Sequence, residues 1–324
     1  MIQARSPLRI TLGGGGTDLP SYYQDYGGFL LSACINQYVY VCATRTFSNG
    51  LVLRYSSIER VEQKEDIQHP VIRETLDLIG LDISRLEITT IADIPAGTGL
   101  GSSGSFTTAL LKALYRLENR SISQKELAEM ACHIEIERLQ EPVGKQDQYV
   151  AAYGGLNSYE FHPDGAVTVT PLKLSGDILT GFKRQVSLFC TGITRSAPTI
   201  LKVQDDSTRG GDTSMIDNLH YVKELGYRSR DALEAGDISG FGRLLGEHWE
   251  FKKRRAPSMT NPDIERYYQA AMEAGALGGK LIGAGGGGFL MFCTEHPVRL
   301  RKAMSEQGLA ELDYDFDFEG TRLL

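Results

Sequence analysis

The sequence lacks the patterns that build metal centres and disulfide frameworks. Its five cysteines, at positions 34, 42, 132, 190 and 293, show no CxxC or other paired spacing, and its six histidines are equally scattered. This scatter argues against a zinc site of the His/Cys type. It favours reduced thiols, which are typical of cytoplasmic proteins.

Long apolar runs and an excess of basic residues are lacking too. No apolar run approaches the roughly 18 residues that cross a bilayer, and residues 1–6 have no signal-peptide core. The net charge is -7, whereas proteins that bind nucleic-acid backbones present a basic face. We therefore expect a soluble cytoplasmic protein whose partners include neither a membrane nor a nucleic acid, with room for a local basic pocket that holds a small phosphorylated ligand.

The chain has the size and composition of a globular enzyme. It has 324 residues, of which 41% are hydrophobic and 23% charged, and this length predicts about two domains. Beyond Gly155 the pattern changes to strands at 156–160, 167–171 and 186–190, followed by long helices at 215–233 and 238–253. The two halves of the chain therefore differ in organisation.

The most informative stretch is a glycine loop at 95–104 that follows a predicted strand at 86–91. Apolar residues recur at helical spacing after it, from Phe106 to Leu117, so a helix is predicted to begin at Ser102 and Ser103. The first amide hydrogens of a helix have no partner within it, and the helix dipole adds partial positive charge there. The loop therefore predicts an anion site, most plausibly for the phosphates of a nucleotide.

Other glycine motifs fit this stretch less well. Gly99-x-Gly101-x-x-Gly104 matches the dinucleotide fingerprint, but that motif needs an acidic residue at the end of a second strand, and Glu118 stands at the polar end of a helix instead. A P-loop needs a lysine that is not present here. A loop that merely turns the chain is the remaining structural interpretation.

A second glycine loop follows the first predicted strand, at 5–12. Apolar residues alternate with polar ones in that strand, so Arg9 is predicted to point away from the core. Four glycines at 13–16 then lead to Asp18, and such a costly run favours a loop that wraps a ligand. Asp18 suits hydrogen bonds to sugar hydroxyls, and a cap on the following turn is an equal alternative.

Carboxylates gather where a third predicted helix ends. A capping box at 123–126 opens this helix, and Pro142 with Gly144 ends it, so that Asp147 stands near the start of a short new helix. A carboxylate is favourable at the start of a helix because of the helix dipole, so Asp147 has a structural interpretation as well as a functional one. Glu135 and Glu137 lie about 200° apart on a helix, so both cannot face one site.

Four further expectations concern segments outside these motifs. Residues 29–47 and 51–55 are predicted to form a hairpin around 48–50, and 205–213 a mobile loop. The basic run at 251–255 is expected to be a solvated helix end rather than a phosphate grip. A third glycine loop lies between apolar runs within 280–292.

Three motifs in one order resemble the GHMP kinases, and the resemblance covers nearly the whole chain. They are residues 5–10 with 16–18, residues 95–103 and residues 283–289. Other motifs, including Gly-Lys-Gln-Asp-Gln-Tyr at 144–149, look most like the bacterial D-glycero-D-manno-heptose 7-phosphate kinases. The resemblance implies an α+β fold with an S5-like nucleotide-binding domain at 1–160, a ferredoxin-like domain at 161–324 and a site between them.

The resemblance also implies roles for individual residues. Asp147 is implied to be the base and Arg9 to steady the attacking oxygen, while Ser103 and Glu135 hold Mg²⁺. The implied ATP-binding residues are Pro95, Gly97, Gly99, Leu100, Gly101, Ser102, Ser103 and Gly104. The implied sugar-binding residues are Gly15, Gly16, Thr17, Asp18, Gly154, Gly285, Gly286 and Gly287. Arg195, which follows a strand, is our prediction for the substrate's own phosphate.

The implied activity is transfer of a phosphoryl group from ATP to the anomeric hydroxyl of the heptose phosphate, on the way to nucleotide-activated heptose for surface polysaccharide. Gly16 departs from the family, because galactokinases and mevalonate kinases carry histidine there, and this leaves the identity of the sugar open. The alternatives are a fucose-type or other C1 kinase of an unphosphorylated sugar, a non-catalytic sugar-sensing protein and, third, a dinucleotide-dependent oxidoreductase. A homodimer is a family-level expectation.

Overall fold

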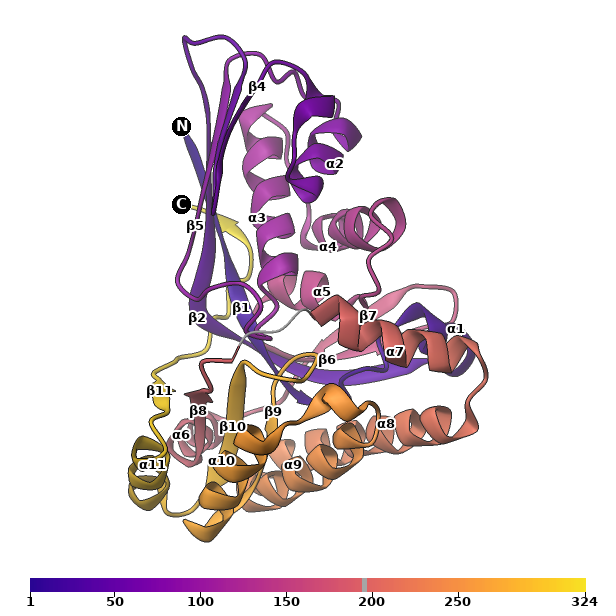
Figure 1. Ribbon diagram of the computed structural model, residues 1–324, viewed down its shortest axis with the longest axis vertical. Helices are drawn as coiled ribbons and strands as arrows, with labels where there is room; N and C mark the ends of the chain where they lie inside the picture. Colours follow the sequence, from indigo (N-terminus) through magenta and orange to yellow (C-terminus); the bar gives the residue numbers. More distant parts are fainter. Residues whose placement is uncertain (194–196) are drawn as a thin grey trace.

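The computed structural model describes residues 1–193 and 197–324, and its strands form two sheets (Figure 1). The larger sheet has the order β12-β1-β2-β5-β3-β4, with β6 added to β2 and β7 added to β6. Its strands are β1 (Ile2–Gly13), β2 (Gly28–Arg45), β3 (Leu51–Arg54), β4 (Ile58–Val61), β5 (Leu86–Ala92), β6 (Leu156–Phe161), β7 (Val167–Pro171) and β12 (Arg322–Leu323). The smaller sheet, β11-β8-β10-β9, contains β8 (Val186–Cys190), β9 (Ala276–Leu281), β10 (Phe289–Thr294) and β11 (Ala310–Leu312).

The alternation predicted for the first strand is present. Leu8, Ile10 and Leu12 of β1 are fully buried in the core, and Arg9 lies on the opposite face. β1 pairs antiparallel with β2, and β12 from the other end of the chain pairs with β1. The two termini therefore lie close together at the same edge of the molecule (Figure 1).

The predicted hairpin between residues 29–47 and 51–55 is wrong. Both strands exist, but β5 lies between them, antiparallel to β2 and parallel to β3. β3 instead forms a hairpin with the next strand, β4. A turn signal reports only a local reversal of the chain, whereas β5 offers the longer apolar partner for β2, with Leu86 and Ile88 fully or almost fully buried.

One layer of helices covers one face of the larger sheet (Figure 1). It contains α2 (Pro70–Leu78), α3 (Ser102–Leu117), α4 (Gln124–Cys132) and α5 (Gln146–Tyr153), with α1 (Pro20–Tyr26) near the sheet's end. The predicted start of α3 at Ser102 is confirmed. The predicted capping box is confirmed too, because the Ser123 hydroxyl accepts from the Glu126 amide while the Glu126 carboxylate accepts from the Ser123 amide.

The remaining helices are α6 (Gly176–Gln185), α7 (Ala197–Arg209), α8 (Thr213–Glu234), α9 (Ile238–Lys253), α10 (Pro262–Glu273) and α11 (Pro297–Glu306). Most of them pack around the smaller sheet, whereas α8 also packs on β1 and β2 of the larger sheet and α7 lies against α1 and α8. The mobile loop expected at 205–213 is wrong for its first half, because α7 continues to Arg209. Buried Gln204 and Thr208 lie four residues apart on one face, and Arg209 pairs with Asp205 on another, so tertiary contacts outweigh the polar composition.

The two sheets share an apolar core. Leu8, Ile10 and Phe29 of the larger sheet pack in one cluster with Phe241 of α9 and Met291 of β10. No helix within the described residues is long and apolar enough to span a bilayer. β7 and β12 complete the larger sheet, so the chain returns to it after residue 160; the division at that residue stays a prediction.

Candidate active site

A cavity of about 310 Å³ lies where the two sheets meet. Its walls are the loop after β1, the glycine loop with the first turn of α3, the start of α5, and, from the smaller sheet's side, the ends of α9 and β9. Residues distant in sequence therefore meet in one hollow. Concave sites of this size with convergent polar groups are typical of small-molecule binding.

The first turn of α3 opens into the cavity. Ser102 and Ser103 line it, and Gly101, the residue before the helix, has the left-handed conformation with φ of 79°. Gly104 brings α5 close, because a Cβ there would lie 2.7–2.8 Å from backbone and side-chain atoms of Asp147. The unpaired amides of the helix start and the carboxylate of Asp147 are thereby held side by side.

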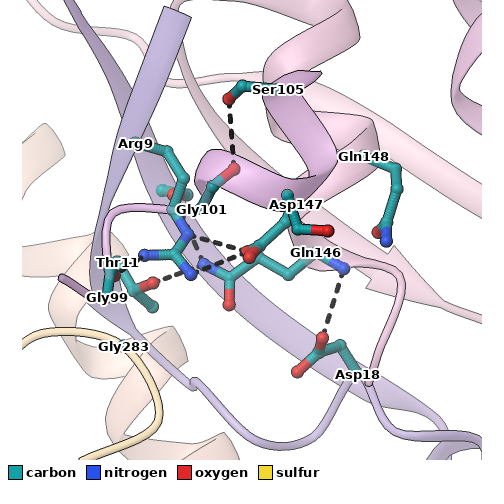
Figure 2. Close-up of polar contacts among 12 residues, drawn as sticks. Arg9, Thr11, Asp18, Gly99, Gly101, Ser105, Gln146, Asp147, Gln148 and Gly283 are labelled. Carbon is teal, nitrogen blue, oxygen red and sulfur yellow. Dashed lines mark hydrogen bonds and ion pairs between the residues drawn. The ribbon is translucent and has the colours of Figure 1, made fainter. Parts of the chain in front are cut away.

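Asp147 and Arg9 form an ion pair in the cavity wall (Figure 2). Nε of Arg9 donates to Oδ1 of Asp147 at 2.8 Å, and Nη2 lies 2.7 Å from the same oxygen. Nη1 of Arg9 donates to the Gly99 carbonyl, which ties the guanidinium to the glycine loop. The Asp147 side chain keeps 29% of its surface exposed, so it is fixed in direction yet open to a ligand.

Asp18 lies across the cavity from this pair, at the start of α5. Its Oδ2 accepts from the Gln146 amide at 3.1 Å (Figure 2), and its Oδ1 accepts from the Gly16 amide at 3.3 Å. Burial raises the pKa of Asp18, and the nearby charge of Asp147 raises it further. The expected cap on the following turn is wrong, because the helix after Asp18 begins at Pro20 without a side-chain cap, and Asp18 instead accepts from the first amide of the distant α5. Asp18 lines the cavity, and its contact with sugar hydroxyls stays a prediction.

Glu135 is buried beside the start of α3, in a π-helical turn that spans His133–Arg138. Its carboxylate accepts from Ser103 at 3.0 Å, from Thr107 at 2.6 Å and from Gln148 at 3.1 Å. Burial raises its pKa to about 7. Glu137 points elsewhere and contacts His133 at the surface, as the helical spacing predicted.

Glu135 and Ser103 fit a magnesium ion. Mg²⁺ prefers oxygen ligands and keeps waters or phosphate oxygens at its other positions. The structure places a carboxylate and a hydroxyl 3.0 Å apart, beside the cavity-lining first turn of α3. A divalent ion would also offset the cost of ionising so buried a carboxylate.

The two distant glycine loops touch at the cavity rim. A Cβ on Gly283 would lie 2.5 Å from Cα of Gly99, and one on Gly288 would lie 2.1 Å from the Thr98 carbonyl oxygen. Side chains at these positions would separate the loops. The loop that follows β9 therefore completes the cavity wall beside the glycine loop before α3.

The chain matches two family models, the GHMP kinases N terminal domain over residues 67–155 and the GHMP kinases C terminal over residues 229–309. It is 32% identical to D-glycero-alpha-D-manno-heptose 7-phosphate kinase of Campylobacter jejuni, over 99% of this chain and 98% of that protein. The chain belongs to the GHMP kinases. The enzyme is thus a phosphotransferase of the sugar-kinase type that takes an alcohol group as acceptor and ATP as donor.

Solved and more distant relatives agree with this assignment. The crystal structure of a D-glycero-D-manno-heptose 1-phosphate kinase from Bacteriodes thetaiotaomicron superposes with a TM-score of 0.82 at 28% identity, covering 100% of this chain and 99% of that one. Galactokinase of Pyrococcus furiosus is 26% identical over 89% of this chain and 87% of that protein. The expected α+β, two-domain architecture of a GHMP kinase is thereby confirmed.

Most of the residues predicted from sequence meet in the cavity of this GHMP kinase. They are Arg9, Gly15, Gly16, Asp18, Gly97, Gly99, Gly101, Ser102, Ser103, Glu135 and Asp147. This set includes all four residues expected to act on the reacting groups or the metal. Their roles stay predictions, because the shared cavity places them without any ligand.

Other predicted residues do not line the cavity. They are Pro95, Leu100, Gly104, Thr17, Gly154, Gly285, Gly286 and Gly287. Leu100 is fully buried in the core, Thr17 donates to the carbonyls of Gly14 and Phe29, and Gly154 packs against Gly320 near the chain end. These residues shape loops of the GHMP kinase. Arg195 lies outside the described residues.

A basic cluster was missed. Lys252 and Arg255 were expected to be solvated, but they are 7% and 6% exposed and line the cavity with His248 and Lys280. The expectation is wrong for these two because their helix end packs on β9 under the loop after β1. It holds for Arg254, which is exposed. The spacing of positions 248, 252 and 255, which puts them on one helix face, was the available signal.

Proposed function

We propose that this GHMP kinase transfers the γ-phosphoryl group of ATP to the anomeric C1 hydroxyl of D-glycero-D-manno-heptose 7-phosphate. The observation that carries the proposal is the Arg9–Asp147 pair, held beside the first turn of α3 and within one cavity with Asp18 and Glu135. The substrate is suggested by the similarity over the whole chain to a heptose 7-phosphate kinase.

In this proposal the chain positions two reactants and neutralises charge, which is most of what phosphoryl transfer requires. The amides of the first turn of α3 hold the phosphates of ATP. Asp147 accepts the proton of the sugar hydroxyl, and Arg9 keeps the Asp147 carboxylate in place. Asp18 accepts hydrogen bonds from other sugar hydroxyls. An anomeric hydroxyl is more acidic than an ordinary alcohol, so Asp147 needs no unusual basicity.

Ser103 and Glu135 would hold Mg²⁺, which when bound neutralises charge on the phosphate oxygens. Glu135 is buried with three donors around it, so its carboxylate has one fixed orientation. Arg195 stays our prediction for a contact to the sugar's own phosphate. We further propose a cytoplasmic homodimer that supplies activated heptose for surface polysaccharide; the five free thiols are consistent with a reducing compartment.

The test is ATP consumption across a panel of sugars, each offered with and without its terminal phosphate. We expect the highest kcat/KM for the heptose 7-phosphate and a product whose new phosphate is on C1, as phosphorus NMR would show. Preference for fucose or another unphosphorylated sugar would contradict the proposed substrate. If the folded protein binds sugars but consumes no ATP with any of them, the sensor alternative would be favoured.

The Arg195 contact needs a separate test. Arg195→Ala should raise the Michaelis constant for the heptose 7-phosphate about tenfold or more, because a charge-assisted contact is lost. An unchanged constant would remove Arg195 from the site.

A further inference from the structure

The basic cluster on the smaller sheet's side of the cavity consists of His248, Lys252, Arg255 and Lys280. The first three lie on one face of α9 or just beyond its end, and Lys280 faces them from β9. Each of the four side chains is at least nine-tenths buried. The cluster is therefore built into the protein interior, and all four of its side chains line the cavity.

Within the described residues, the two lysines and the arginine of the cluster are held by neutral oxygens rather than by carboxylates. Among the described residues, no carboxylate forms a salt bridge with Lys252, Arg255 or Lys280. Lys252 donates to the carbonyls of Leu281 and Gly283, and Lys280 donates to the Leu12 carbonyl at 3.2 Å. Buried charges are normally paired, so such a cluster is suited to an anion that arrives from solution.

Several buried nitrogen atoms of the cluster have no partner in the part of the chain that the structure describes. Within the described chain, Nη2 of Arg255 and both ring nitrogens of His248 have no hydrogen-bond partner although they are buried. The other groups of Arg255 are fixed, because Nη1 donates to the Gly15 carbonyl at 2.9 Å and Nε to Asn218 at 3.0 Å. The guanidinium is therefore held in place with one donor group free.

Gly16 makes room for this guanidinium. A Cβ on Gly16 would lie 2.3 Å from Nη1 of Arg255, and φ of Gly16 is 101°, where side chains are strained. The loop that ends in Asp18 and the basic cluster are thus fitted to each other. A sugar held by Asp18 would lie beside Arg255. The charge of Asp18 acts on Arg255 by raising its pKa, against the larger lowering by burial.

We infer that Arg255, Lys252, Lys280 and His248 bind the terminal phosphate of the sugar substrate and so select a phosphorylated sugar over an unphosphorylated one. This inference rests on the proposed function, since it assigns a subsite for that substrate. A phosphate dianion would take the free donors of Arg255 and restore charge balance to the two lysines. The sugar would then span the cavity, with C1 at Asp147 and its phosphate at the cluster.

Arg255→Met tests the inference, with Arg254→Met as the matched control. Arg254 is the adjacent arginine, exposed and outside the cavity wall. We expect Arg255→Met to lower kcat/KM for the heptose 7-phosphate about 10- to 100-fold, because charge-assisted hydrogen bonds are lost. Its kcat/KM for unphosphorylated heptose should fall clearly less, because only the contact of Arg255 with the Asp18 loop is lost there. Arg254→Met should leave the kcat/KM for both sugars and the KM for ATP near those of the wild type.

A binding measurement keeps the inference testable if Arg255→Met folds poorly. Calorimetry would use a heptose 7-phosphate analogue without the anomeric hydroxyl, which binds but cannot react, with Lys280→Met as the second variant. Weakened binding of the analogue, with unchanged binding of its unphosphorylated counterpart, would support the inference.

Three outcomes would overturn it. The first is an equal fall of kcat/KM for phosphorylated and unphosphorylated heptose in Arg255→Met. The second is a raised KM for ATP with unchanged kinetics for the sugars, which would assign the cluster to the nucleotide. The third is a wild-type preference for phosphorylated heptose that persists in both variants, in which case the proposed function stands and the subsite fails. A wild-type enzyme with no such preference would instead contradict the proposed substrate itself.

Discussion

The two sides of the cavity are equipped to hold anions by different means. On the larger sheet's side, the proposed phosphate site consists of backbone amides at the start of α3 and the glycines around them, and Arg9 is the one basic side chain among the described residues that line this side. On the smaller sheet's side, four basic side chains from α9 and β9 gather under a loop from the other half of the chain. A backbone site needs a contiguous glycine motif, whereas a side-chain site is assembled from scattered positions.

This difference determines whether the binding of each phosphate depends on protonation, for the phosphates of ATP on one side and the sugar phosphate on the other. Backbone amides carry fixed partial charges that do not titrate, so they suit the triphosphate that every turnover requires. Buried lysine and histidine respond to their surroundings, and burial lowers the pKa of Lys252 and His248 well below the usual values. The side-chain site can therefore discriminate between sugars through charge.

The largest effect is expected at Asp147, which stands between the two sides. Asp147→Asn should lower kcat by roughly 10²- to 10⁴-fold, because the amide cannot accept the proton of the sugar hydroxyl. ATP affinity should change little, since the first turn of α3 is unaltered. Steady-state kinetics and nucleotide titration would check both, and unchanged turnover would remove Asp147 from the mechanism.

Glu135 provides the next test, with Glu137 as its matched control. Glu135→Gln should raise the Mg²⁺ concentration for half-maximal activity about 10- to 100-fold, because a buried anionic ligand is lost. Glu137→Gln should leave it unchanged, since that carboxylate contacts only His133 at the surface. Equal behaviour of the two variants would contradict the assignment of the metal site.

The same variant has a predicted effect on stability without metal. The folded-state pKa of Glu135 is raised from 4.5 to about 7, so the native protein retains a proton that the unfolded chain releases. Stability of the metal-free protein is therefore lost as pH rises between these values. At pH 8 this loss amounts to about 3 kcal/mol or less in the free energy of unfolding, and Glu135→Gln should abolish it. Thermal unfolding of both proteins at pH 5 and pH 8 would measure the difference.

A substitution at Gly104 tests whether the proposed phosphate site at the start of α3 depends on the close packing of α3 against α5. In Gly104→Ala the added Cβ would meet Asp147 and the Gln148 amide nitrogen at 2.7–2.8 Å, so we expect about 1–3 kcal/mol of destabilisation and reduced turnover. Gly176→Ala is the control, because nothing lies within 4 Å of its added Cβ. Chemical denaturation would compare them, and equal stabilities would mean that α3 and α5 adjust easily.

The sequence predicted the backbone site far better than the side-chain site. The start of α3, the separate directions of Glu135 and Glu137, and the strand alternation around Arg9 follow from local periodicity, and the structure has all three. The burial of Arg255 depends instead on a loop more than 200 residues away in sequence, at Gly15 and Gly16, and that of Lys252 on the end of β9. Likewise, the hairpin failed because no local signal places β5 between β2 and β3.

The smallest effect is a pH dependence of sugar selection, caused by Lys280. Burial, together with the charges of Arg255 and Arg9, lowers the pKa of Lys280 to about 7, and His248 and Lys252 also face it. Above pH 7 the free enzyme must take up a proton before this lysine can bind a phosphate dianion, so affinity falls as pH rises. The ratio of kcat/KM for phosphorylated over unphosphorylated heptose should fall up to about fivefold from pH 7 to pH 8.

This ratio isolates the side-chain site, because titration of Glu135 and the nucleotide affects both sugars equally. The second ionisation of the sugar phosphate, near pH 6, is almost complete over the range and adds little. Lys280→Met should make the ratio smaller and independent of pH in that interval. A ratio that keeps its slope in Lys280→Met would place the titrating group elsewhere, and a flat ratio in the wild type would mean that Lys280 stays protonated through its contact with the Leu12 carbonyl.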